Sequence, residues 1–239
     1  MPRHVLVTGA SNGIGLAIAA RFAEAGDEVV ITARGADRLA AAADKIGAVG
    51  VPCDAADPDQ VAALRDQLPD QLDVLVNNAG GIREFTSAAA TDLQELAGLW
   101  RANLDTNLLS AVLVTEAVQA RLRAGGSVIS LGSIGAERGA GSYGVAKAAL
   151  AAWSVGVSAE LGPRSITSNV ISPGYIEDTE FFADRMTAER RAALIAATHD
   201  KRAGTVDDIA ETAFFLASPG ARHITAQLIN VNGGAHVTR

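Results

Sequence analysis

Short apolar runs alternate along the chain with longer runs whose apolar residues recur at helical spacing. Runs of the first kind predict buried β-strands, and an apolar residue every three or four positions predicts an amphipathic helix. Strands are expected at residues 5–7, 29–32, 49–53, 72–76, 127–131, 166–171 and 227–231. Helices are expected at residues 15–24, 37–46, 59–68, 143–161 and 207–216, and over about 92–123 with an interruption near 103–106.

This strict alternation of strands and helices predicts parallel strands joined by crossover helices. The expected strands are apolar almost throughout, which is typical of a sheet with helices on both faces. The sequence therefore predicts an α/β fold of the Rossmann type, with a doubly wound, seven-stranded parallel sheet in a three-layer α/β/α arrangement. We expect one domain spanning residues 1–239.

One segment, residues 174–204, departs from this alternation. Its strand signal is weak, Phe181 and Phe182 stand together, and an Arg-rich helical stretch follows. In an open α/β sheet, a long excursion after the carboxyl end of a strand lies over the ligand crevice. We therefore expect residues 174–204 to form a substrate lid.

Composition narrows the class of protein. The 239 residues are 49% hydrophobic, which is enough to bury a sizeable core and excludes general disorder. The net charge of −7 argues against a nucleic-acid or anionic-membrane surface. The single cysteine, Cys53, fits a reducing compartment, and the four histidines lack metal-ligand spacing. The longest apolar stretch, 148–157, is shorter than the ~20 residues that span a bilayer, so we expect a cytoplasmic protein without a metal.

Three glycines, Gly9, Gly13 and Gly15, fall between the first expected strand and the first expected helix. Glycines there permit a tight turn, the approach of a pyrophosphate to the backbone, and close packing of helix on strand. The helix N-terminus adds free N–H groups and a positive dipole end. A tight turn without a ligand is the alternative for the glycines alone, but the flanking strand and helix favour a dinucleotide site.

Candidate catalytic residues follow the fifth expected strand. Tyr143 and Lys147 are four positions apart on an expected helix and share one face, and Ser133 lies at the carboxyl edge of the sheet. A phenol with a pKa of ~10 is a poor acid–base group at neutral pH, and we expect the Lys147 ammonium to lower that pKa. A serine hydroxyl can stabilise an oxyanion on a reacting carbonyl. Each residue alone is commonly a surface or turn residue, so the hypothesis rests on the combination.

The order of these motifs resembles the short-chain dehydrogenase/reductase family, and most closely its 3-oxoacyl-[acyl-carrier-protein] reductase branch. The resemblance covers essentially the whole chain and includes Asn77-Asn78-Ala79-Gly80 and Pro173-Gly174. It implies that Asn107, which interrupts a helix, joins Ser133, Tyr143 and Lys147 and holds a water between Lys147 and solvent. It also implies that the cofactor is contacted by Gly9, Ser11, Asn12, Gly13, Ile14, Gly15, Arg34, Asp54, Ala55, Asn78, Ala79, Gly80, Tyr143, Lys147, Pro173, Gly174, Ile176 and Thr179.

The residue after the second strand bears on the choice of cofactor. Arg34 stands where an acidic residue would bind the ribose 2′-hydroxyl of NAD, and a guanidinium suits a 2′-phosphate instead. We therefore expect a preference for NADP(H). Asp37 close by leaves NAD(H) as the alternative, and Asn12 stands where some NADP-using relatives carry a second basic residue.

The expected function is the interconversion of a ketone and a secondary alcohol by hydride transfer with a preference for NADP(H), in which Tyr143 is the acid and base and Lys147, Ser133 and Asn107 assist it. The alternatives are a non-catalytic NAD(P)-binding regulatory protein, an NAD-dependent alcohol, polyol or steroid dehydrogenase, and a sugar-nucleotide epimerase or dehydratase. Tyr143 follows Ser133 by only ten positions, an interval shorter than the resemblance implies, so recognition of an acyl carrier protein stays open. The resemblance implies a homotetramer, with a dimer as the alternative.

Overall fold

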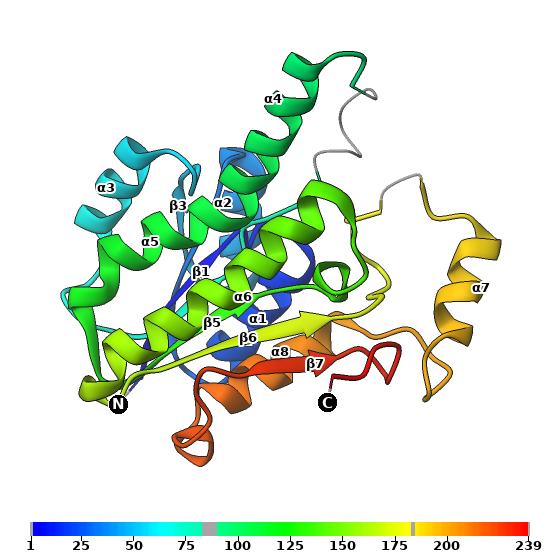
Figure 1. The fold of residues 1–239 in the computed structure, drawn as a ribbon. Coiled ribbons are helices and arrows are strands. Elements are labelled where there is room, and N and C mark those ends of the chain that lie inside the picture. The colour runs from blue at the N-terminus through cyan, green and yellow to red at the C-terminus, as the bar shows by residue number, and fades with distance from the viewer. Residues whose placement is uncertain (1, 83–89, 183–184, 239) are drawn as a thin grey trace.

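The structure is a computed structural model that describes residues 2–82, 90–182 and 185–238. In this part of the chain, seven parallel strands form one sheet in the order β3-β2-β1-β4-β5-β6-β7 (Figure 1). This is the predicted doubly wound arrangement. The strands are β1 (His4–Thr8), β2 (Glu28–Ala33), β3 (Val49–Pro52), β4 (Leu72–Asn77), β5 (Leu122–Leu131), β6 (Thr167–Pro173) and β7 (Leu228–Val231).

Helices cover both faces of the sheet, as Figure 1 shows. Strand β1 illustrates why: Val5 and Val7 pack into the apolar cluster beneath α1, α2 and α8, whereas Leu6 between them packs into the cluster beneath α3, α5 and α6. Successive side chains of a strand point to opposite faces, so a continuous apolar run needs two cores. The helices are α1 (Gly13–Glu24), α2 (Ala36–Ile46), α3 (Pro58–Gln67), α4 (Leu93–Leu104), α5 (Ser110–Val118), α6 (Gly141–Leu161), α7 (Ala188–Ala196) and α8 (Val206–Leu216).

Most elements begin and end within two residues of the predicted bounds, and the largest difference lies at the start of β5. Strand β5 begins at Leu122, five residues earlier than expected, because Leu122 pairs with Leu72 before a register shift in the ladder. The helical run predicted to reach residue 123 was therefore wrong at its end. The predicted interruption of that run is a π-helical turn, Asp105–Leu109, which lies between α4 and α5.

The order of the strands creates a switch point. Strand β1 has β2 on one side and β4 on the other, so the crossover connections leave the carboxyl ends of β1 and β4 in opposite directions. A crevice opens at such a point in doubly wound sheets, and ligands bind there. The glycine turn follows β1, and Asn78-Ala79-Gly80 follows β4, so both motifs lie at this crevice.

Residues 174–204 leave the sheet after β6 and are held at both ends. Ile176 pairs with Gly204 in an isolated parallel bridge, and the Gly204 N–H donates to the Tyr175 carbonyl oxygen at 3.0 Å. Between these ends α7 stands apart from the sheet (Figure 1), and none of its residues, all of which the structure describes, is buried. The segment is thus anchored at its base while its middle projects.

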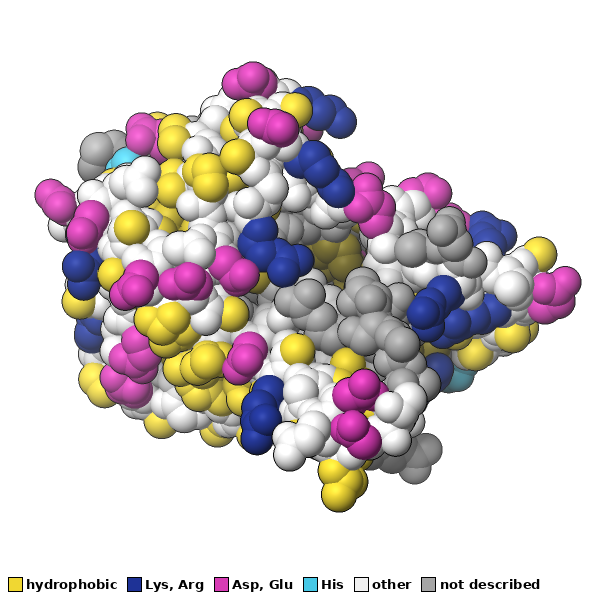
Figure 2. All heavy atoms as spheres, turned by 90° about the horizontal axis from the view of Figure 1, so that it is seen from above, with side chains coloured by type: hydrophobic (Ala, Val, Ile, Leu, Met, Phe, Trp, Pro, Cys, Tyr) yellow, Lys and Arg dark blue, Asp and Glu magenta, His cyan; other side chains and the backbone are white. Residues whose placement is uncertain are grey.

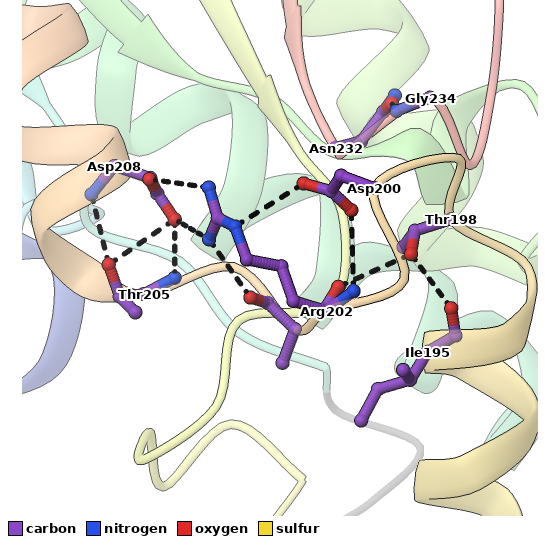
Figure 3. A network of polar contacts seen from close by, with 9 residues as sticks. Ile195, Thr198, Asp200, Arg202, Thr205, Asp208, Asn232 and Gly234 are labelled. Carbon is purple, nitrogen blue, oxygen red and sulfur yellow. Dashed lines mark hydrogen bonds and ion pairs between the residues drawn. The ribbon is translucent and has the colours of Figure 1, made fainter.

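A polar network fixes the returning end of this segment to α8, as Figure 3 shows. The Arg202 guanidinium donates to both carboxylate oxygens of Asp208 at 2.6 and 3.0 Å. Asp208 also completes a capping box with Thr205 at the N-terminus of α8, and the guanidinium lowers the pKa of the Asp208 carboxyl to about 2. These contacts therefore hold the end of the 174–204 segment against the N-terminus of α8.

Candidate active site

The turn between β1 and α1 packs directly on the segment that follows β4. The side-chain amide of Asn78 donates to the carbonyl oxygens of Thr8 and Gly9 at 3.0 and 2.9 Å. A Cβ atom at Gly15 would lie 2.3 Å from that amide nitrogen and 2.7 Å from the Gly9 oxygen, so only glycine fits. The first turn of α1 holds no acidic residue, which leaves its N–H groups and positive dipole end suited to an anion.

A cleft of about 650 Å³ runs along the carboxyl ends of the strands, from this turn to the start of α6. Its volume lies within the range of cofactor and small-molecule sites. The structure brings all the residues predicted to contact the cofactor together in its wall, and their contacts with a cofactor stay predictions. They are Gly9, Ser11, Asn12, Gly13, Ile14, Gly15, Arg34, Asp54, Ala55, Asn78, Ala79, Gly80, Tyr143, Lys147, Pro173, Gly174, Ile176 and Thr179.

The predicted catalytic side chains meet at one end of this cleft. Tyr143 lies in the first turn of α6 and Lys147 one turn later, and each residue is only 4% exposed. The Lys147 ammonium donates to the carbonyl oxygen of Leu131, the last residue of β5, at 2.8 Å. The Ser133 hydroxyl accepts a hydrogen bond from the Gly135 N–H at 3.0 Å and is also bonded to the Tyr143 phenol. The bond to Tyr143 lowers the pKa of the phenol, so in it the Ser133 hydroxyl is the donor, and its proton points toward the position of the reacting oxygen.

Burial dominates the proton affinities of this pair. It raises the pKa of Tyr143 to about 12, against the opposing effect of the Ser133 hydrogen bond. It lowers the pKa of Lys147 to about 8. The expectation that Lys147 brings the Tyr143 pKa down toward neutrality is therefore wrong for the protein by itself. The ammonium lies 6.0 Å from the centre of the phenol ring and is bonded to Leu131, so loss of hydration outweighs its charge.

Asn107 lies behind the cleft and does not line it. Its side-chain amide donates to the carbonyl oxygens of Gly81 and Asn103 at 2.8 and 3.1 Å and accepts from the Gly81 N–H at 3.0 Å. A Cβ at Gly80 would lie 2.8 Å from the Asn107 side-chain oxygen and 3.1 Å from the Lys147 nitrogen. Asn107 thus braces the backbone beside Lys147 from within the π-helical turn, and the implied water stays a prediction.

An aromatic wall, Tyr175, Phe181 and Phe182, rises beside Tyr143 from the 174–204 segment. The rings of Phe181 and Tyr143 are 5.8 Å apart, those of Phe181 and Phe182 5.0 Å, and those of Phe182 and Tyr175 5.8 Å. Phe181 and Phe182 line the cleft. The predicted lid therefore contributes an apolar surface next to the phenol.

The other end of the cleft carries two arginines. Arg34, which the sequence indicated, lines it, and so does Arg38 on α2, which the sequence analysis missed. The signal that could have found Arg38 is its position one helical turn after Arg34, at a helix start next to the crevice. Asp37 is not among the described residues that line the cleft. Its position therefore gives no support to the idea that its carboxylate binds the ribose of NAD(H).

The remaining candidate features are the cysteine, a metal site and a membrane span. Burial raises the pKa of the Cys53 thiol to about 11, which agrees with its interpretation as a small core residue. In residues 2–82, 90–182 and 185–238, no group of three or more His, Cys, Asp or Glu side chains is placed to hold a metal. No helix in the same part of the chain is long and apolar enough to cross a membrane. The face in Figure 2 carries interspersed acidic and basic side chains.

The sequence of the chain is similar to those of known oxidoreductases. The family model described as enoyl-(acyl carrier protein) reductase matches residues 9–236. The chain is similar to the 3-oxoacyl-[acyl-carrier-protein] reductase FabG of Escherichia coli (strain K12), with 34% identity over 97% of this chain and 96% of that protein.

Solved structures show the same likeness. A short-chain dehydrogenase from Burkholderia cenocepacia J2315 in complex with NADP has a TM-score of 0.86 and 34% identity, covering 98% of this chain and 97% of that one. A 7α-hydroxysteroid dehydrogenase complexed with NADH and 7-oxo glycochenodeoxycholic acid has a TM-score of 0.88 and 30% identity, covering 97% and 93%. The fold, the cleft and these comparisons agree: the chain belongs to the short-chain dehydrogenase/reductase family of NAD(P)-dependent oxidoreductases.

Proposed function

We propose that the protein is an NADP(H)-preferring oxidoreductase that interconverts a ketone and a secondary alcohol, with a reaction like that of 3-oxoacyl reductases. One observation carries this proposal: Ser133, Tyr143 and Lys147 meet at one end of a cleft whose other end is a glycine turn at a helix N-terminus. Acid–base groups and a phosphate cradle in one cleft are what hydride transfer from a dinucleotide requires.

The residues present fit such a cofactor. Gly9, Gly13 and Gly15 line the cleft, so the turn presents backbone without a side chain at these positions, as a pyrophosphate needs. Gly80 likewise keeps the space beside Lys147 clear, because any side chain there would meet Asn107 and Lys147. Residues of the glycine turn would hold the phosphates, and Lys147 would hold the ribose next to the nicotinamide.

Each catalytic residue has a separate task. The nicotinamide cofactor, when bound, would supply or take up the hydride. In reduction, the Tyr143 phenol gives its proton to the ketone oxygen as negative charge builds there, and in oxidation the phenolate takes the proton of the alcohol. Ser133 donates a hydrogen bond to the same oxygen. The Lys147 ammonium stabilises the phenolate, and its bond to Leu131 fixes where that charge lies.

The NADP(H) preference rests on Arg34. Arg34 lines the cleft after β2, where the adenosine ribose lies in this fold, and a guanidinium suits a 2′-phosphate. The similar Burkholderia structure was solved with NADP, although the similar steroid dehydrogenase was solved with NADH. An Arg34→Asp variant should shift the preference toward NADH, and an unchanged ratio of the two dissociation constants would contradict the role of Arg34.

The substrate proposal rests on Phe181 and Phe182. Two rings that line the cleft beside Tyr143 favour a ketone with an apolar body, which includes 3-oxoacyl chains and fused rings. The related curated proteins named as 3-oxoacyl reductases favour the first of these.

We also propose a homo-oligomer, for which a tetramer is the expected size. Large apolar side chains remain exposed on two helices that contact one another: Leu93 at 81% and Trp100 at 39% on α4, and Val145 at 48% and Val155 at 52% on α6. Such surface is typical of an interface between subunits. Light scattering of the purified chain measures the state, and a monomer would contradict the proposal.

The proposed function is tested by a screen of 3-oxoacyl thioesters, cyclic ketones, steroids and sugars with NADPH and NADH, using wild type and Tyr143→Phe. We expect the variant to lose at least about 10³-fold in kcat/KM for the ketone, since it lacks the proton donor, while NADPH affinity stays within about twofold. A wild type that binds NADPH but reduces nothing in the screen would instead support a non-catalytic regulatory protein.

A further inference from the structure

A carboxylate of the protein itself spans the adenosine end of the cleft. Glu180, seven residues after the end of β6, accepts a hydrogen bond from the Asn12 side-chain amide at 2.8 Å. The Arg38 guanidinium donates to both oxygens of the same carboxylate at 3.0 Å. Asn12 precedes α1 and Arg38 lies in α2, and all three residues line the cleft. The carboxylate thus joins the 174–204 segment to both walls.

The position of this carboxylate coincides with a predicted phosphate position. Through Asn12 and Arg38 it bridges the glycine turn and the first turns of α2, where the adenosine ribose binds in doubly wound folds. Its neighbour Thr179 lies against the turn, since a Cβ at Gly13 would be 3.9 Å from the Thr179 methyl group. The donors that hold Glu180 are therefore the donors that a phosphate on the ribose 2′-oxygen would meet.

The chemistry of these donors fits a phosphate monoester. An arginine fork and a side-chain amide bind carboxylate and phosphate oxygens in the same way. A phosphate monoester carries about −1.5 to −2 charges at neutral pH, against one for a carboxylate, so it is the stronger partner. The Glu180 and Arg38 side chains are 70% and 57% exposed, and an exposed pair of this kind is easily broken.

We propose that Arg38 and Asn12, together with Arg34, bind the 2′-phosphate of NADP(H), and that Glu180 is an internal carboxylate that holds these donors until the phosphate replaces it. This inference rests on the NADP(H) preference proposed above. NAD(H) has no 2′-phosphate and leaves the Glu180 contacts in place, so Glu180 competes with NADP(H) alone. When the phosphate binds, Glu180 is released and the segment that carries it loses its hold on the glycine turn.

The test measures dissociation constants of NADPH and NADH by nicotinamide fluorescence at fixed low salt, without substrate. We expect Arg38→Gln to weaken NADPH binding by about tenfold or more, because charge-assisted bonds to the phosphate are lost, with NADH binding unchanged within twofold. Glu180→Gln should tighten NADPH binding by about two- to fivefold, as removal of an exposed ion pair allows, and leave NADH unchanged.

Two further variants sharpen the test. In the Arg38→Gln background, adding Glu180→Gln should bring a smaller gain than in wild type, because only Asn12 remains of the two donors that hold Glu180. Glu177→Gln is the matched control: it removes a carboxylate of the same segment that pairs with Arg191 outside the cleft lining, and it should change neither affinity.

The outcomes separate this inference from the proposed function. If wild type prefers NADPH but Arg38→Gln and Glu180→Gln bind it as wild type does, the inference is overturned and the cofactor preference stands. If wild type prefers NADH while both variants still shift NADPH affinity in the stated directions, the preference is wrong and the inference stands. A Glu180→Gln variant that weakens NADPH binding overturns the inference.

Discussion

The ammonium of Lys147 faces the Leu131 carbonyl at 2.8 Å and lies 6.0 Å from the ring centre of Tyr143, one helical turn away. Both residues are buried, so each favours its neutral form: the Tyr143 pKa rises to about 12 and the Lys147 pKa falls to about 8. The protein by itself therefore keeps the phenol protonated, as a proton donor for reduction must be. The same burial brings the pKa of Lys147 close to physiological pH.

This relationship predicts the pH dependence of ketone reduction. Measured as kcat/KM for NADPH, which reports groups of the free enzyme, the rate should be level from about pH 6 to 7.5. Above the Lys147 pKa of about 8 it should fall about tenfold per pH unit, because the ammonium loses its charge while Tyr143 stays protonated. Lys45→Met, on the exposed surface of α2, should show the same profile as wild type. A level profile up to pH 10 would exclude Lys147 as the titrating group.

The buried ammonium should also destabilise the fold. A pKa lowered from 10.5 to about 8 corresponds to about 3 kcal/mol, which is present in full below pH 8. Between pH 8 and 10.5 the unfolded chain binds a proton that the folded chain does not, so wild-type stability rises with pH. Urea unfolding should show wild type gaining about 3 kcal/mol relative to Lys147→Met across this window.

Lys45 again provides the control for stability. Its side chain is exposed, so the difference in unfolding free energy between wild type and Lys45→Met should not vary with pH. If the difference between wild type and Lys147→Met is equally constant, the lysine is not desolvated in solution as the structure has it.

The sequence predicted those parts of the site whose position follows from the neighbouring strand or helix along the chain. The glycine turn, Ser133 and the Tyr143–Lys147 pair each follow a strand or begin a helix, and parallel strands bring such positions to one edge. It missed Arg38, although that residue follows Arg34 by four positions at a helix start, because a basic residue there is equally typical of the solvent-exposed face of an amphipathic helix. The bond between Asn12 and Glu180 joins residues 168 positions apart, and nothing local specifies it.

The pKa values of Tyr143 and Lys147 could not be predicted from the sequence either. Spacing indicated that Lys147 is near Tyr143, but the sign of the pKa shift depends on how completely both are buried, which only the packed structure gives. Similarly, the start of β5 depends on the pairing of Leu122 with Leu72 rather than on its own pattern, since Gly125 and Gly126 interrupt the apolar run. Fold class and order of elements were predictable, whereas boundaries and charge states depended on tertiary contacts.

A Gly15→Ala substitution should weaken the cofactor site. Helix propensity alone would favour alanine by about 1 kcal/mol. The new methyl group, however, would meet the Asn78 amide at 2.3 Å and the Gly9 carbonyl at 2.7 Å, and overpacking of this kind costs about 1–3 kcal/mol. We expect lower stability in urea and at least about a tenfold rise in the NADPH dissociation constant, as the displaced turn no longer presents its N–H groups.

Gly98→Ala is the matched control for this substitution. Gly98 lies inside α4, and a Cβ atom there would meet nothing within 4 Å beyond its own helix backbone. Alanine should therefore raise stability by about 0.5–1 kcal/mol and leave NADPH affinity unchanged. If Gly15→Ala behaves as Gly98→Ala does, close packing of the turn against Asn78 is not what shapes the site.

Phe181→Ala tests whether the aromatic wall sets the substrate class. The Phe181 ring stands 5.8 Å from that of Tyr143 and lines the cleft, so an apolar ketone reaching the phenol would bury itself against it. Loss of one such ring contact removes about 1.5–3 kcal/mol, which predicts at least about a tenfold fall in kcat/KM for bulky apolar ketones. Small ketones, which cannot reach across to the ring, should lose far less, and NADPH affinity should stay within about twofold.

Phe215→Ala is the control for this variant. It removes a ring that is 49% exposed on α8, away from the cleft, and should leave kcat/KM for both kinds of ketone unchanged. An equal loss for bulky and small ketones in Phe181→Ala would mean that the ring positions Tyr143 rather than the substrate.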